Sequence, residues 1–252
     1  MNPLTKNTIM ILAAWSGPVF VLTYLIFWIG LGHNLPPPNF MAMTGAELVN
    51  EYYGKYTADI KLGMTVTTFV GLLYLLWSAC LASIMAEKSG PTLFSNLELA
   101  GGLLTGWLLA FCPAIWLSCA VFVNVVDPDI ILMVHGFTWF MFDMTYMITG
   151  VQLLGIGLWT VFHKEQSFFP AWAGWSALAV GVIFLPLTLI PYVTSGPFTV
   201  AGIWNFYIVF GTWGFMFFSV YSYYLLKELN RQRRELIGAT HRTSHTEQYQ
   251  RT

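Results

Sequence analysis

The stretch Ile130 to Phe162, IILMVHGFTWFMFDMTYMITGVQLLGIGLWTVF, decides the fold. It is apolar almost throughout, and Asp143 is the one formally charged residue inside it. A helix needs about 20 mostly apolar residues to cross about 30 Å of hydrocarbon. This stretch is longer than that, with Asp127 and Asp129 just before it and Lys164 just after it. It therefore predicts a transmembrane helix that is tilted or that projects from the bilayer.

Composition extends this prediction to the whole chain. The 252 residues are 56% hydrophobic and 9% charged, whereas a soluble domain carries about 25% charged residues. Because one soluble core cannot hide this much apolar surface, we expect an all-α, polytopic transmembrane helix bundle with six spans. The spans are predicted at about residues 8–31, 62–85, 97–123, 131–162, 171–193 and 203–226. They form one domain, 1–229, and the polar tail 230–252 is expected to be helical through Arg234 and then disordered.

The lysines and arginines predict the orientation. Six spans place the N-terminus, the turns at Lys88 and Lys164 and the C-terminal tail on one side, which then holds nine Lys and Arg, against Lys55 and Lys61 on the other. Basic residues mark the cytoplasmic side, so both termini are predicted to be cytoplasmic in a cell membrane, a bacterial inner or plasma membrane. The basic run from Lys227 to Arg234 is interpreted as an anchor on anionic lipid, and no nucleic-acid partner is expected.

A short amphipathic helix is predicted between the first two spans. Thr44 and Glu47 have capping-box spacing, and Tyr52, Tyr53 and Tyr56 follow on one side. Such a helix would lie on the outer membrane surface or over the mouth of the bundle.

The stretch from Ala46 to Met85 resembles uncharacterised six-span bacterial integral membrane proteins of about this length. The features that carry the resemblance are a short helix bearing Glu47 and Glu51, then Lys61-Leu-Gly63, then a glycine-bearing span. The resemblance covers about the first 125 residues. It implies a topology and no particular chemistry.

Asp143 and His135 are the predicted ligand-binding residues. A carboxyl at membrane depth is costly, so it usually faces protein or water rather than lipid. At 100° per residue, His135 and Asp143 lie about 80° apart around one helix. Asp143 could accept a proton, contact a ligand or bind a metal. It could equally be a structural carboxyl that is hydrogen-bonded to a neighbouring helix, and His135 could be an ordinary interfacial histidine.

A metal site is the second candidate. Asp127, Asp129 and His135 gather near the outer end of the fourth span, and His33 ends the first span on the same side. Mixed carboxylate and imidazole ligands suit a divalent transition metal. His33 and His135 could also ligate a single haem. No cofactor is predicted outright.

Three functions remain open from the sequence. The first is a small-molecule carrier or a binder of hydrophobic or polar ligands, with Asp143 as its polar contact. The second is an accessory subunit of a membrane complex with a partner subunit, and the third is a membrane metal or redox enzyme using the outer His and Asp residues. No phosphate-binding glycine loop is present, which argues against ATP-driven work by this chain. Whether the protein is an enzyme stays open, and a function without catalysis is favoured.

Overall fold

The computed structural model describes residues 1–249, with their side chains except at 215, 216 and 240–249. Every regular element in this part of the chain is helical. In chain order these are α1 (Pro3–Tyr24), η1 (Leu25–Leu31), η2 (Phe40–Ala42), α2 (Gly45–Leu48), η3 (Val49–Tyr53), α3 (Gly54–Ser89), α4 (Leu93–Phe122), α5 (Pro128–Met144), α6 (Tyr146–Phe162), α7 (Ala171–Ile183), η4 (Leu185–Tyr192), η5 (Trp204–Val209), η6 (Gly211–Phe217) and α8 (Phe218–Tyr249).

Within residues 1–249, six helical stretches are long and apolar enough to cross a membrane, which confirms the predicted number. They are Pro3–Leu31, Gly45–Ser89, Leu93–Phe122, Pro128–Phe162, Ala171–Tyr192 and Trp204–Ala239. Each contains most of one predicted span.

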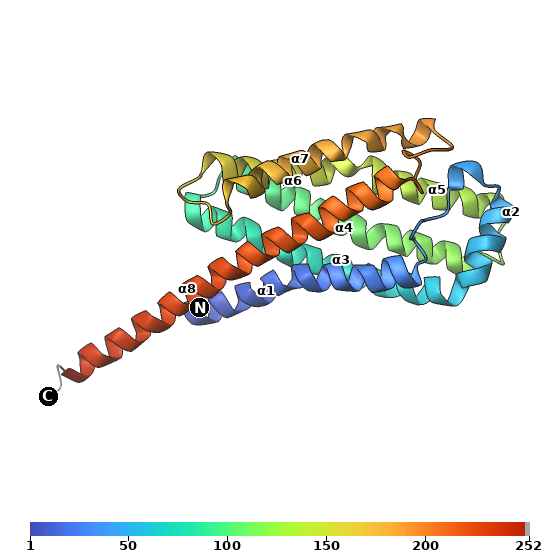
Figure 1. Ribbon diagram of the computed structural model, residues 1–252. Coiled ribbons are helices and arrows are strands. Elements are labelled where there is room, and N and C mark those ends of the chain that lie inside the picture. Colours follow the sequence, from blue (N-terminus) through green and yellow to red (C-terminus); the bar gives the residue numbers. More distant parts are fainter. Residues whose placement is uncertain (250–252) are drawn as a thin grey trace.

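The six stretches lie side by side in an elongated bundle (Figure 1). One end, here called the terminal end, carries the N-terminus and the α3–α4 and α6–α7 turns; the opposite, cap end carries α2 and the start of α5. Lys6 pairs with Glu87 at the terminal end, and Lys88 Nζ lies 2.6 Å from Glu228 Oε1. These pairs join α1 and α8 to the end of α3. Helix α8 projects past the bundle as a single helix (Figure 1) and continues beyond Arg234 to Tyr249. Residues 250–252 of the predicted disordered tail lie outside the described residues.

The stretch Ile130 to Phe162 is two helices rather than one. Thr145 lies between α5 and α6 with φ −89° and ψ 15°, which is not a helical conformation. The Thr145 hydroxyl donates to the carbonyl of Met141 at 2.6 Å, so a side chain competes with the backbone for that acceptor. A threonine inside an apolar run does not by itself indicate the end of a helix, so this interruption was not predicted from the sequence.

The capping box at Thr44 and Glu47 is confirmed, and it starts α2. The helix that follows is not a separate surface helix, because α2 and η3 lead directly into α3 with only a kink at Tyr56. Tyr52 and Tyr53 are buried. This segment therefore forms a cap packed onto the end of the bundle.

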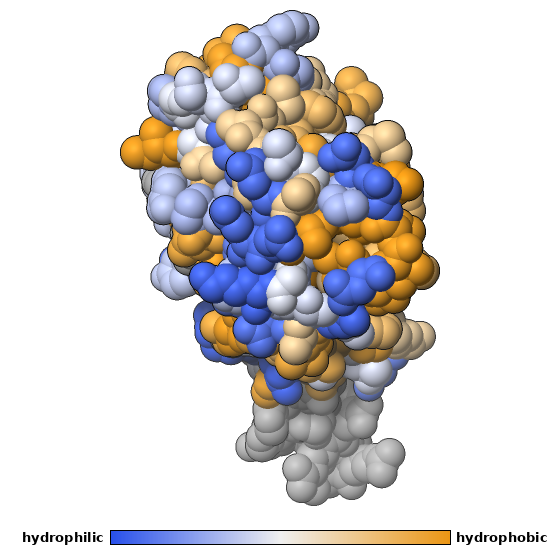
Figure 2. Space-filling model, turned by 90° about the vertical axis from the view of Figure 1, so that its right-hand side faces the viewer, coloured by the Kyte–Doolittle hydropathy of each residue, from blue (hydrophilic) through white to orange (hydrophobic). Residues whose placement is uncertain are grey.

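Aromatic rings fill the core near the cap end. Trp28 lies at its centre, with ring centroids 6.0 Å from Trp116, 5.9 Å from Trp139 and 5.2 Å from Phe210. Large apolar side chains also remain exposed along the sides of the bundle, among them Leu12, Trp15, Phe69, Leu104, Trp107 and Trp175. Viewed onto the cap end, hydrophilic residues form a band across the middle with hydrophobic residues beside it (Figure 2).

Candidate functional site

Asp143 is buried in the last turn of α5, immediately before the break at Thr145. Its side chain is 3% exposed, and Asn205 Nδ2 donates to Asp143 Oδ2 at 2.9 Å. Asn205 also donates to the carbonyl of Val200 at 3.0 Å, so both of its amide hydrogens are used. The structure therefore supplies Asp143 with a partner from η5, far along the chain.

A small cavity of about 50 Å³ lies beside Asp143. Such a volume holds on the order of a few water molecules. Its polar wall includes Asp143, Thr105 and Thr149, and the two threonine hydroxyls are 3.0 Å apart. Leucine, phenylalanine and Trp213 side chains form most of the remaining wall. The cavity thus combines a mostly apolar wall with a few converging hydrogen-bonding groups, which is typical of ligand-binding sites.

A chain of polar side chains leads from this cavity to a second buried carboxyl, that of Glu98. Tyr74 interacts with Thr105 and donates its hydroxyl hydrogen to Gln152 Oε1. Gln152 Nε2 in turn donates to Glu98 Oε1 at 3.1 Å. Together with the Thr105–Thr149 contact, these bonds form a polar chain through three helices, α3, α4 and α6.

Glu98 itself is fully buried, at 0% exposure. Ser78 Oγ donates to Glu98 Oε1 at 2.8 Å, whereas Glu98 Oε2 is buried without a hydrogen-bond partner. Glu98 is the second residue of the span predicted at about residues 97–123, and the sequence did not predict that its side chain would be a buried acceptor between three helices. The available signal was that Ser78 and Gln152 are polar residues inside apolar spans, but nothing in the sequence showed that they meet Glu98.

Glycines allow the three helices to approach closely at this point. A Cβ atom on Gly102 would lie 1.8 Å from Ser78 Oγ, and one on Gly101 would lie 2.6 Å from the backbone nitrogen of Gln152. Gly155 faces the backbone of Glu98 in the same way, with 2.6 Å to its nitrogen. Small residues at helix contacts are how membrane helices bring backbones and polar groups together.

His135 makes a separate pair of contacts near the cap end. It is 1% exposed, its Nδ1 lies 2.8 Å from the Tyr53 hydroxyl, and Trp139 Nε1 donates to its Nε2 at 3.1 Å. Because an indole nitrogen only donates, Nε2 is the acceptor and a neutral ring carries its hydrogen on Nδ1. Both ring nitrogens are therefore engaged with Tyr53 and Trp139, and Asp143 is not among these partners.

The residues of the predicted metal site, Asp127, Asp129, His135 and His33, contact different parts of the protein. His33 Nε2 lies 3.1 Å from Asp59 Oδ2, and the His33 ring stacks on Tyr56 at 3.8 Å. Asp127 caps the start of α5, where its Oδ1 accepts from the backbone nitrogen of Asp129 at 2.8 Å. Among the described residues, no group of three or more His, Cys, Asp or Glu side chains is placed to hold a metal ion.

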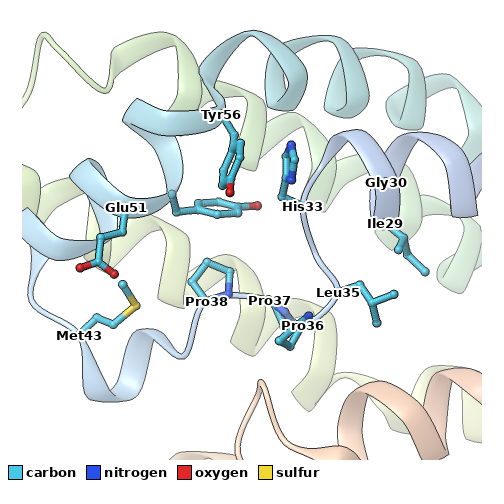
Figure 3. A pocket seen from close by; sticks show the side chains of 11 residues that line it. Ile29, Gly30, His33, Leu35, Pro36, Pro37, Pro38, Met43, Glu51 and Tyr56 are labelled. Carbon is cyan, nitrogen blue, oxygen red and sulfur yellow. The ribbon is translucent and has the colours of Figure 1, made fainter.

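A wider pocket of about 530 Å³ opens at the cap end. Figure 3 shows Tyr56 and His33 together beside the open space, with Pro36, Pro37 and Pro38 opposite. Tyr52 also lines it and donates to the carbonyl of Gly32 at 2.6 Å, which ties the cap to the end of η1. This pocket shares no lining residue with the cavity beside Asp143.

A third hollow lies between α6 and α7. It measures about 260 Å³, and its wall is almost wholly apolar, with Gly150 and Gly181 in positions where an added Cβ would meet no atom within 4 Å. Tyr146, the first residue of α6, lines both this groove and the cavity beside Asp143. Tyr146 is therefore the residue at which the groove and the cavity beside Asp143 meet.

Fold and site together define the class of this protein: over residues 1–249 it is all-helical, with six helices long and apolar enough to cross a membrane and buried acidic and polar side chains between them. Comparisons with protein-family models, with curated proteins and with solved structures find no match to this chain.

Proposed function

We propose that this chain is an integral membrane protein whose six helices span a bilayer with both termini on the cytoplasmic side. The exposed apolar side chains along the sides of the bundle support this, since a membrane would cover them. Lys6, Lys88 and Arg231 lie at the terminal end, and Lys55 and Lys61 lie toward the cap. This bias supports a cytoplasmic terminal end.

Within this bundle, we propose that the cavity beside Asp143 and the α6–α7 groove together bind a long apolar molecule with one carbonyl end. The observation that carries the proposal is that Tyr146 lines both hollows. The groove would hold the apolar part of a molecule taken from the lipid, and movement of Tyr146 would admit its polar end to Asp143. The function is that of a ligand binder or carrier.

The chemistry of Asp143 favours a neutral, hydrogen-bond-accepting end. Among the described residues, no Lys, Arg or His pairs with Asp143, and an isolated ionised carboxylate is costly to bury. A neutral acid accepts at one oxygen and donates from the other. Since Asn205 donates to Oδ2, the other oxygen is the donor that remains for a ligand carbonyl.

The test is photolabelling of the purified chain with a long-chain ketone that carries a diazirine group. We expect wild-type protein to be labelled on α6 and α7, and Asp143→Asn to weaken labelling about tenfold, the equivalent of about 1.4 kcal/mol. Gly150→Leu should block labelling by filling the groove. Gly211→Leu is the matched control, because an added Cβ there also meets no atom within 4 Å and Gly211 does not line the groove. Equal labelling of all four proteins would contradict the proposal.

A further inference from the structure

The two oxygens of the buried Glu98 carboxyl differ in their hydrogen bonds. Ser78 and Gln152 both donate to Oε1, at 2.8 and 3.1 Å, and Oε2 is buried without a partner. Because two donors converge on Oε1, that oxygen is the acceptor of the two carboxyl oxygens. Oε2 is then the oxygen that is placed to carry a hydrogen.

The groups around Glu98 provide no positive charge. The titratable side chains that interact with it are Tyr74 and Cys80, both from α3, while α6 contributes the neutral Gln152. Among the described residues, no Lys, Arg or His forms an ion pair with Glu98. A counter-ion would therefore have to come from outside the protein.

Close packing limits what that ion can be. Hypothetical Cβ atoms on Gly101 and Gly102 would already overlap Gln152 and Ser78, and one on Gly155 would overlap the backbone of Glu98. A metal ion needs several oxygen ligands at about 2.0–2.6 Å around a space of its own. A proton needs no such space, so it is the cation that fits.

The same carboxyl is joined to the ligand cavity by hydrogen bonds. Gln152 accepts from Tyr74, Tyr74 interacts with Thr105, and Thr105 and Thr149 line the cavity. The Gln152 amide does not readily release a proton, so a proton cannot move along this chain. What the chain can transmit is a change in the orientation of its hydrogen bonds. An ionised Glu98 accepts these hydrogen bonds more strongly than a neutral one, so it would hold the donors pointed toward itself more firmly. A carbonyl in the cavity would draw donors the other way.

We propose that Glu98 is a proton-binding site and that the Gln152–Tyr74–Thr105–Thr149 chain links its protonation to occupancy of the cavity beside Asp143. On release, the Oε2–H bond breaks, its electron pair stays on Glu98 as a carboxylate, and the proton passes to water at the terminal end. Glu98 lies six residues after the Thr92 cap of α4, about 9 Å along the helix at 1.5 Å per residue. Ligand binding and proton binding at Glu98 favour one another, so ligand should bind more tightly at lower pH. The linkage, but not the proton site, rests on the proposed function.

Infrared spectroscopy of the full chain without ligand tests the proton site. Because Asp143 is also proposed to be a neutral acid, we expect carbonyl absorption from two protonated carboxylic acids. The band assigned to Glu98 should shift in D₂O, disappear as the pH rises, be missing in Glu98→Gln and remain in Asp143→Asn. A spectrum of Glu98→Gln identical to that of wild type, or a band unchanged by D₂O and pH, would overturn the site. Should Glu98→Gln not fold, Ser78→Ala serves instead: loss of one donor to Oε1 should move the band to higher frequency, and an unmoved band would count against Glu98.

The linkage is tested with the diazirine ketone across a pH series. Half-saturation of labelling should require more ketone as the pH rises in wild type, and this dependence should be weaker in Glu98→Gln, where only Asp143 remains to lose its proton. An equal pH dependence in both proteins would overturn the linkage. If the ketone binds to neither protein, the proposed function fails and the linkage with it, while the infrared result still decides the proton site.

Discussion

Asp143 and Glu98 are both buried carboxyls, but they occupy different kinds of surroundings. Asp143 sits at a break between two helices, with one donor from Asn205 and a cavity beside it. Glu98 sits inside a continuous helix, receives two donors on one oxygen and is enclosed by glycine contacts. A helix break leaves space for a ligand, whereas close helix packing leaves space only for a proton.

The largest expected effect concerns the glycines that enclose Glu98. Gly101→Ala places a methyl group 2.6 Å from the backbone nitrogen of Gln152, so α4 and α6 must separate. Overpacking of this kind costs about 1–3 kcal/mol. The measurement is the free energy of unfolding in mild detergent.

The matched control is Gly150→Ala, in α6 beside the open groove. A Cβ atom there meets nothing within 4 Å, and alanine favours helix by about 1 kcal/mol over glycine. This variant should be as stable as wild type or more so. Equal losses for the two substitutions would show that the packing around Glu98 is no tighter than that beside the groove.

The second effect separates the two carboxyls by their hydrogen bonds. Glu98→Ala leaves Ser78 and Gln152 without their shared acceptor, which costs about 1–3 kcal/mol for buried donors. Asp143→Ala leaves Asn205 still bonded to the carbonyl of Val200. We therefore expect Glu98→Ala to lower the free energy of unfolding by more than Asp143→Ala does, and the reverse order would contradict the contacts assigned here.

The smallest effect on stability should come from Tyr74→Phe, which removes the hydroxyl between the two sites. One hydrogen bond contributes about 0.5–1.5 kcal/mol. The same variant should nonetheless weaken the pH dependence of ketone labelling, because it interrupts the chain between Gln152 and Thr105. Tyr56→Phe, at the cap-end pocket, is the control and should keep that dependence. A pH dependence unaltered in Tyr74→Phe would mean that Glu98 and Asp143 act independently.

Features that depend on neighbouring residues could be predicted from the sequence. The capping box at Thr44 and Glu47 needs only their spacing, and it is present. Helix α7 ends at Ile183 and the 3₁₀ helix η4 begins at Leu185, just before Pro186, and a proline inside an apolar run is a local signal for such an interruption. Both depend on local backbone chemistry.

Features that depend on which helices meet could not be predicted. His135 and Asp143 share a helix but contact Tyr53 and Asn205 respectively, which are remote in the chain. Glu98 gained its importance from Ser78 and Gln152, on two other helices. The break at Thr145 is of another kind, because the Thr145 hydroxyl bonds the carbonyl of Met141 only four residues earlier. In most helices such a bond does not end the helix.

The sequence by itself determined that the described part of the chain is all-helical, with six helices long and apolar enough to cross a membrane. It could do so because hydropathy over about 20 consecutive residues is a local property. Only the tertiary structure decided that one buried carboxyl opens on a cavity while the other is enclosed and that a chain of hydrogen bonds leads from the enclosed carboxyl to that cavity. Those outcomes depend on glycine contacts and on donor positions contributed by separate helices, and no run of consecutive residues contains that information.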